Sequence, residues 1–353
     1  MTAAAVLGLA GCGGGGKTGA SRTPSHPIGD AAIKAADVVA RPGAFQRPLD
    51  AAPGPNGKVI YFVATGDHGP AVFSVPGSGG AETLVTDGAP LAKPTGVGVA
   101  TDGQRIYVAD QEARPAQAPT ATAAAGAPGS SAPATSAPAT SAAAAAGAIL
   151  TVRTTTSAGG LTAPTVLPGT VGRAPRGLDV VNQGDANVIY FTGTDPGDGK
   201  PGLFQVSSDG GTVLTIAEGA PFTSPDSVVV SAQGVAYVTD QGAGPGQGQV
   251  FRVSGGTVMP VLTGLHLGAP AGVTLVNNDA TLLVSSIDGA TLSDQVLFLD
   301  LATGTTAAAT KVIGANKNSS GGLHRAHNAT DLAWADIQGQ VYRVRLGGGP
   351  GLR

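Results

Sequence analysis

The sequence contains an internal repeat, in which a proline precedes a short apolar run, a polar turn and a second apolar run that ends in aspartate. Residues 94–99 (PTGVGV) lead in this way to 106–110 (IYVAD), and residues 225–230 (PDSVVV) lead to 236–240 (AYVTD). A repeat of this kind restricts the fold to an architecture in which similar units pack against one another. The six copies begin at Pro48, Pro94, Pro175, Pro225, Pro270 and near residue 321.

Each copy continues with further short apolar runs after turns rich in glycine. Third runs include 249–253 (QVFRV) and 340–344 (QVYRV), and a fourth run follows in most copies, for example 212–216 (TVLTI). Runs of this length, rich in Val, Ile, Tyr and Phe and separated by Gly, Asn and Asp, are typical of β-strands. Four strands in each of six copies predict an all-β fold, a six-bladed β-propeller with four-stranded antiparallel blades.

The last copy has no fourth run, because only GGGPGLR follows Leu346. Residues 33–39 (IKAADVV), which precede the first copy, have the composition of a strand. An N-terminal strand that completed the last blade would close the ring and leave no exposed sheet edge. We therefore expect the ring to be closed by this N-terminal strand.

One step between copies is much longer than the others, and residues 112–147 account for the excess. Ala, Pro, Ser and Thr dominate this segment, which cannot bury enough apolar surface to offset its ordering entropy. We expect a disordered loop between the second and third strands of the second blade, with the third strand resuming at 149–152 (ILTV). A linker between two domains is the alternative, but it would leave half a blade on each side. The prediction is one propeller domain over residues 31–346, followed by a tail over 347–353.

The N-terminal residues have the pattern of an export signal. Residues 2–11 (TAAAVLGLAG) are too short to cross a bilayer as a helix, which needs about 20 residues, but they fit the apolar region of a secretory signal. Residues 9–12 (LAGC) resemble the bacterial lipobox, whose cysteine becomes lipidated. The sequence therefore predicts a signal peptide over 1–11, lipidation of Cys12 and a flexible tether over 12–30. The protein would be exported and anchored to a bacterial membrane, facing the periplasm or the cell exterior.

The signal has no Lys or Arg before its apolar run, which leaves open whether the true start lies upstream of Met1. The alternative is an apolar tail with a free, buried Cys12. Residues 11–18 (GCGGGGKT) also match the phosphate-loop pattern, but Pro24 and Pro27 follow where that loop requires a helix. We therefore expect no nucleotide site there.

The charge balance excludes some partners. The chain has 20 Lys and Arg against 23 Asp and Glu, a formal charge of -3, and no basic cluster. It therefore lacks the electrostatic features of a nucleic-acid-binding protein and of a polybasic membrane surface, so we expect membrane contact through the lipid anchor only. The sequence contains no HExxH, GxSxG or CxxC motif, and it does not disclose a reaction.

The repeat unit, P-x-G-h-x-h followed by (N/D)G-x-h-Y-h-x-D and Q-h-h-x-V (h, apolar), resembles the NHL and gluconolactonase-like group of six-bladed β-propellers. The resemblance covers the chain from Pro48 to Leu346 apart from the insert. It implies the fold but no single function, because the group includes lactonases, lyases and binding platforms.

In that group, the loop that enters the first strand and the loop that follows the second strand share one face of the ring. The resemblance therefore implies a binding face. Its residues would be Arg176, Asp226, Asp110, Asp195, Asp240, Asp288 and Asp336. Hydrolytic members of the group hold Ca²⁺ or another divalent cation in the channel through Glu, Asn and Asp oxygens, which suit a hard cation. We assign no metal ligands in this sequence.

The aspartate that ends each second strand recurs in every copy, so a structural role in its turn explains it better than a role in chemistry. Residues that break the repeat are better catalytic candidates, and the densest group lies in the last copy around His324 and His327. Imidazole could act there as a base or ligand. On a strand, however, side chains three residues apart point to opposite faces, and ordinary surface positions are the alternative explanation.

Two functions are consistent with these patterns. The first is a non-enzymatic binding or interaction module at the cell envelope, whose partner is an envelope protein, a glycan or a small molecule. The alternative is a divalent-metal-dependent hydrolase of the lactonase or esterase type. A hydrolase requires at least three ligands that converge at the channel mouth, whereas in a binding platform the repeated aspartates are engaged in their own turns.

Overall fold

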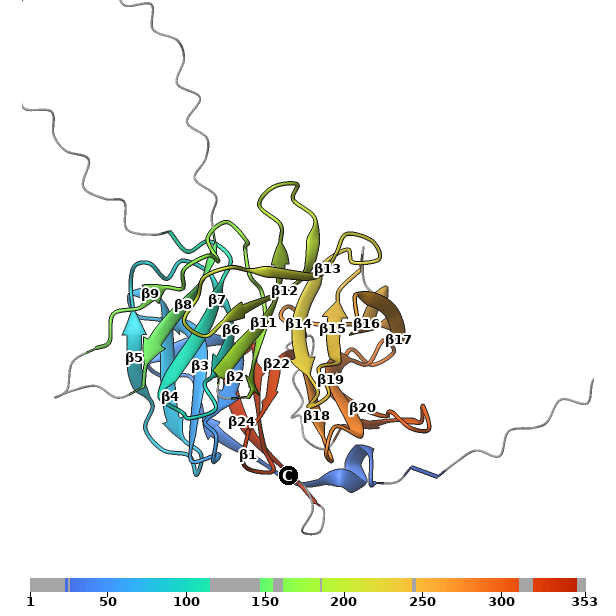
Figure 1. The fold of residues 1–353 in the computed structure, drawn as a ribbon. Helices are drawn as coiled ribbons and strands as arrows, with labels where there is room; N and C mark the ends of the chain where they lie inside the picture. The colour runs from blue at the N-terminus through green and yellow to red at the C-terminus, as the bar shows by residue number, and fades with distance from the viewer. Residues whose placement is uncertain are drawn as a thin grey trace, which may run out of the picture.

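The computed structural model describes residues 23–24, 26–114, 147–154, 161–184, 186–242, 246–310 and 320–347. These residues form six four-stranded antiparallel sheets arranged as the blades of a propeller (Figure 1). The predicted fold class is therefore confirmed. A short 3-10 helix, η1 (Gly29–Ala32), precedes the first strand.

The blades follow one another in chain order, and each begins with an inner strand that faces the central channel. Blade 1 contains β2 (Phe45–Pro53), β3 (Val59–Gly66), β4 (Gly69–Pro76) and β5 (Thr83–Asp87). Blade 2 contains β6 (Pro94–Val99), β7 (Arg105–Asp110), β8 (Ala148–Arg153) and β9 (Thr165–Val166). Blade 3 contains β10 (Leu178–Gln183), β11 (Ala186–Thr194), β12 (Pro201–Ser207) and β13 (Leu214–Glu218).

The second half of the ring has the same organisation. Blade 4 contains β14 (Pro225–Val230), β15 (Ala236–Asp240), β16 (Gly248–Ser254) and β17 (Thr257–Leu265). Blade 5 contains β18 (Val273–Val276), β19 (Thr281–Ile287), β20 (Asp294–Asp300) and β21 (Thr306–Ala309). Blade 6 contains β22 (Ser320–Arg325), β23 (Asp331–Asp336), β24 (Gln340–Leu346) and, from the other end of the chain, β1 (Ile33–Ala40).

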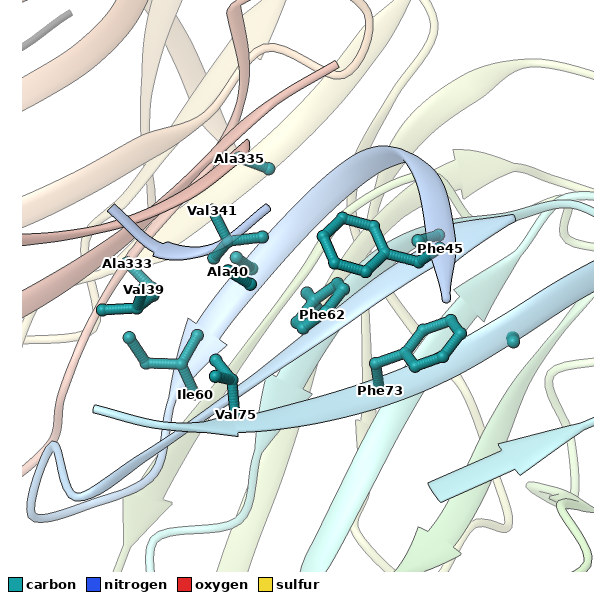
Figure 2. Packing of buried hydrophobic residues seen from close by; sticks show 13 residues of the cluster. Val39, Ala40, Phe45, Ile60, Phe62, Phe73, Val75, Ala333, Ala335 and Val341 are labelled. Atoms are coloured by element: carbon teal, nitrogen blue, oxygen red, sulfur yellow. The ribbon is translucent and has the colours of Figure 1, made fainter. Parts of the chain in front are cut away.

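The strand β1 closes the ring, as the strand count predicts. It pairs antiparallel with β24, with Ala36 opposite Val344 (Figure 1). Figure 2 shows Val39 and Ala40 of this strand beside Val341, within the buried cluster shared by blades 6 and 1. This pairing gives β24 a partner on its outer side and therefore covers a sheet edge that would otherwise be exposed.

The core lies between the blades. The described residues contain six buried apolar clusters, one for each pair of neighbouring blades. Phe45 and Phe62 pack edge to face at 4.8 Å in one of them (Figure 2), and the fully buried Trp334 packs against Tyr342 at 5.0 Å in another. Because both faces of each blade are covered, the inner strands β6 and β14 are buried along their whole length.

The glycine of the P-x-G motif has a packing role at the channel. A Cβ added to Gly177 would lie 2.6 Å from the carbonyl oxygen of Asp226 in the next blade, and one added to Gly96 would lie 2.7 Å from that of Arg176. Real Cβ atoms do not approach backbone so closely, so these positions accept only hydrogen. The motif therefore allows neighbouring inner strands to approach around a narrow channel.

The insert connects β7 to β8. These two strands pair with each other, and Asp110 at the end of β7 lies opposite Ala148 at the start of β8. β7 and β8 are the second and third strands of blade 2. Residues 115–146 of the insert lie outside the described residues, as do residues 1–22 of the predicted signal and tether and the tail from 348. Within the described ranges, no helix combines the length and apolar character that a membrane span needs.

Candidate binding site at the channel mouth

The beginnings of the inner strands and the ends of the second strands meet at one end of the ring. Pro94 lies opposite Asp110 and Pro225 opposite Asp240 in the strand register. A cavity of about 470 Å³ opens at this end, which we call the mouth cavity. Its polar lining consists of Arg47, Thr65, Lys93, Thr95, Gln111, Arg176, Asp226 and Gln241.

Arg176 is a half-buried cation in this cavity, two residues before the inner strand β10 of blade 3. Its Nη1 donates a hydrogen bond of 2.6 Å to Oγ of Ser224 in the loop before blade 4. The backbone N–H of Ser224 in turn donates to Oδ1 of Asp240 at 3.0 Å. The repeated Asp240 therefore fixes the loop that orients Arg176.

Asp226 is the buried carboxyl group of the mouth cavity, with 3% of its surface exposed. Its Oδ2 accepts a hydrogen bond of 3.0 Å from Nε2 of Gln241 and another from the backbone N–H of Ala271. Burial raises the pKa of Asp226 to about 6, although these hydrogen bonds and the charge of Arg176 favour the carboxylate. Asp226 can therefore exchange a proton close to neutral pH.

Arg47 and Lys93 supply the other two cations, and both are exposed. Arg47 lies where β2 departs from regular pairing, between Gln46 and Asp50, and its backbone is left-handed, with φ of 49°. Nζ of Lys93 lies 3.3 Å from a carboxylate oxygen of Glu112.

The aspartates that end the second strands bind turn and loop N–H groups. Asp110 accepts from the backbone N–H groups of Ala92 and Lys93, and Asp240 accepts from those of Thr223 and Ser224. Three others bind N–H groups two residues further along: Asp195 that of Gly197, Asp288 that of Ala290, and Asp336 that of Gln338. Of the predicted binding-face residues, the structure thus brings Arg176 and Asp226 to the cavity wall, while these five aspartates hold loops.

The channel is nearly closed below the mouth cavity. The space within it is about 20 Å³ and is lined by Asp179, His324 and His327 among others, which is room for about one water molecule. His324 is buried, and its Nε2 lies 3.0 Å from Oδ2 of Asp50. Strand alternation does not extend to His327, because β22 ends at Arg325.

A second cavity, of about 310 Å³, opens at the other end of the channel. Arg325 lines it, with Nη1 at 2.6 Å from Oδ1 of Asp279 and 3.1 Å from the carbonyl oxygen of Leu275. A ring nitrogen of His327 lies 3.1 Å from the carbonyl oxygen of Val99, across the channel. These contacts tie several blades together at this end, so Arg325 and His327 have structural partners.

The mouth cavity does not fit the divalent cation that hydrolytic propellers hold. Across the described ranges, no group of three or more His, Cys, Asp or Glu side chains is placed to bind a metal ion. The charged residues of the mouth cavity are three cations and one carboxyl group, whereas Ca²⁺ needs six or more oxygen ligands. The lining instead suits an anion or a polar organic molecule.

Sequence reasoning missed six polar residues of the mouth cavity, and local signals exist for four of them. Arg47 and Lys93 each directly precede the proline that opens a repeat copy. Gln111 and Gln241 each directly follow the aspartate that ends a second strand. Positions that flank the repeated motif therefore line the mouth cavity together with motif positions such as Arg176 and Asp226.

No family model and no curated protein matches this sequence. Solved structures do match its fold. A gluconolactonase from Xanthomonas campestris is 14% identical, with a TM-score of 0.52 over 92% of this chain and 100% of that one. A chain of a nidogen/laminin complex is 14% identical, with a TM-score of 0.52 over 80% and 85%. The PQQ-bound aldose sugar dehydrogenase from Streptomyces coelicolor is 11% identical, with a TM-score of 0.58 over 89% and 98%. Likeness at this identity shows a shared fold, and the differing functions of these proteins do not transfer with it.

Proposed function

We propose that this protein is a binding module that takes a small ligand into the mouth cavity, and that it works at a bacterial cell envelope, anchored through lipid on Cys12. The observation that carries the proposal is the lining of the mouth cavity, which combines Arg47, Lys93 and Arg176 with the buried Asp226. Convergent polar groups in a concave pocket are the usual features of a small-molecule site.

The shape of the channel supports a small ligand over a macromolecule. The mouth cavity, at about 470 Å³, has the size of a typical ligand pocket. Further along the channel, the space lined by Asp179, His324 and His327 is only about 20 Å³. A small ligand therefore fits the mouth cavity and is too large for that space. The sequence leaves two other partners open. One is the end of a glycan, and the other is an envelope protein that inserts a side chain into the mouth cavity.

Rigid loops around the mouth cavity also support binding. Asp110 and Asp240 each receive backbone N–H groups from the loop that enters an inner strand, and these loops carry Lys93 and Ser224. Side chains on loops held in this way lose little conformational entropy when they bind a ligand. We do not propose the hydrolase alternative, because the described residues contain no group of three or more His, Cys, Asp or Glu side chains placed to hold its metal ion.

A thermal melting screen of the full-length chain against small organic acids, polyols and sugars tests the proposal. Two tryptophan variants locate each hit. Ala92 is exposed and lines the mouth cavity, whereas Ala232 is exposed and lines the cavity at the other end. The two positions are matched to each other in their backbone contacts. The N–H of Ala92 donates to Asp110, and the N–H of Ala232 donates to Asp279. We expect a hit that stabilises the wild type and Ala232→Trp but not Ala92→Trp.

Two further readouts separate binding from hydrolysis. We expect the stabilisation to persist in the presence of a chelator, and we expect the ligand to be recovered unchanged by nuclear magnetic resonance after incubation. A hit that is consumed, or whose effect a chelator abolishes, would support the hydrolase instead. If no compound stabilises the wild type while failing to stabilise Ala92→Trp, the small-molecule proposal is wrong.

A further inference from the structure

We propose that the ligand of the mouth cavity is a small hydroxylated organic anion, whose carboxylate binds Arg176 and Arg47 and whose hydroxyl group binds Asp226. This inference rests on the proposed binding function and specifies the chemical class of the ligand. It follows from the charge balance of the cavity, from its backbone geometry and from one unused oxygen atom.

The first observation is that two guanidinium groups of the cavity form no ion pair within the described residues, although the Asp226 carboxyl group acts on Arg176 from the same wall. Lys93 is paired with Glu112, but within the described ranges neither Arg47 nor Arg176 forms an ion pair. A guanidinium group presents planar N–H donors that match the two oxygens of a carboxylate. Two such groups around one concave site favour an anion, and the single carboxyl group in the wall does not offset all three cations.

The second observation is that unusual backbone geometry lies beside both arginines. The described residues include six non-glycine residues with positive φ. One is Arg47 itself, at 49°, within the irregular part of β2. Another is Ala174, at 41°, two residues before Arg176. Such conformations are energetically unfavourable and cluster at functional sites, where surrounding structure maintains them. The fold therefore maintains unfavourable backbone conformations at Arg47 and close to Arg176.

The third observation concerns Asp226. Its Oδ2 receives both of its hydrogen bonds, from Gln241 and from the backbone of Ala271. Its Oδ1 receives none from the described residues. This oxygen therefore remains able to accept a hydrogen bond, and a ligand or water can supply the donor. A ligand hydroxyl group beside the carboxylate that binds the arginines would supply this donor.

Titration calorimetry with three related probes tests the inference on the full-length chain. L-Tartrate carries two carboxylates and two hydroxyl groups, succinate lacks the hydroxyl groups, and threitol replaces each carboxylate with a neutral alcohol. We expect tartrate to bind most tightly, succinate more weakly and threitol at least tenfold more weakly than tartrate, because charge-assisted hydrogen bonds dominate.

Charge-neutralising variants assign the site. We expect Arg176→Gln to weaken tartrate binding about tenfold or more, because it removes hydrogen bonds to a charged group. Arg47→Gln is a second test, and since Arg47 is exposed its replacement leaves the core intact. Arg105→Gln is the matched control, because it removes the same charge from an exposed pair with Asp209 outside the mouth cavity. It should leave tartrate affinity unchanged.

The outcomes separate this inference from the proposed function. Binding of threitol without tartrate would overturn the anionic class and leave the binding function in place. Tartrate binding that survives both Arg176→Gln and Arg47→Gln would overturn the assignment to these residues. If none of the three probes binds, the inference is wrong, and the wider melting screen alone then decides the proposed function.

Discussion

Nε2 of His324 lies 3.0 Å from Oδ2 of Asp50, so a buried hydrogen bond joins the last blade of the ring to the first. The same Oδ2 accepts the backbone N–H of Val97 at 2.7 Å, which brings in blade 2. One carboxyl group thus connects three blades at the channel wall. The strand β1, from the beginning of the chain, pairs with β24 on the outer side of the last blade. The two ends of the chain are therefore joined both at the channel wall and at the outer edge of the ring.

His324→Gln should destabilise the protein by about 3 kcal/mol or more, because it leaves the buried Asp50 without its cationic partner. Urea unfolding measures the change. His68→Gln, at an exposed position, is the control and should have little effect. Equal stability of His324→Gln and the wild type would contradict the structural role of this pair.

The same pair predicts a pH dependence. Burial disfavours the charged imidazolium, but the Asp50 carboxylate outweighs burial and raises the pKa of His324. A raised pKa in the folded state stabilises the protein fully below the unfolded pKa of about 6.5, and this stabilisation is lost as the pH rises through the folded value. The stability difference between the wild type and His324→Gln should therefore be larger at pH 5.5 than at pH 9. A difference that grows with pH would refute this account.

Gly177→Ala should destabilise the protein strongly, by about 2 kcal/mol or more, because its Cβ would meet the backbone of Asp226 and Ser227 at 2.6 and 2.8 Å. Gly54→Ala is the matched control, since its Cβ would find only ordinary contacts at 3.4 Å or beyond. Denaturant melts of the two variants provide the comparison. Similar melts would show that close approach of the inner strands is not required.

The fold was predictable because its information is local and repeated. Each blade carries a similar run of strands and turns, and where the motif has its glycine, as at Gly96 and Gly177, that residue fits the close approach of the next inner strand. Ring closure followed from a missing strand at one end and a spare one at the other. A single repeat copy would not have revealed either feature, whereas six copies made the pattern unambiguous.

The site was less predictable because its residues converge from different blades. His324 and Asp50 are 274 residues apart, and nothing local links them. Strand alternation could not be applied to His327, because the strand ends two residues earlier. Arg176 and Asp226 were found through the resemblance to other propellers, while Arg47 and Lys93 lie outside the repeated motif and needed the structure to bring them together.

Binding at the mouth cavity should depend on pH through Asp226, whose pKa burial raises to about 6. Above pH 6 its carboxylate repels a bound anion, and below pH 6 the neutral acid does not. Arg176 and Asp50 are the charged groups that act on it, with opposite effects on its pKa. Tartrate should therefore bind several-fold more tightly at pH 5.5 than at pH 7.5 by calorimetry. Asp226→Asn should remove this pH dependence. If tartrate binding to that variant still depends on pH, the titration of a different group is responsible and the prediction for Asp226 is wrong.

The envelope location depends on Cys12, which lies outside the described residues. When the chain is expressed in a bacterium with labelled palmitate, the wild type should incorporate the label and fractionate with membranes. Cys12→Ser should do neither. A wild type that remains unlabelled and soluble would contradict the lipid anchor without affecting the account of the mouth cavity.

The most direct test of the central claim is titration of tartrate, or of the best ligand from the screen, into three proteins: the wild type, Ala92→Trp and Ala232→Trp. The account predicts saturable binding to the wild type and Ala232→Trp, and loss of binding in Ala92→Trp, because only that tryptophan fills the mouth cavity. Equal binding to all three proteins, or loss of binding only in Ala232→Trp, would show that the mouth cavity is not the binding site.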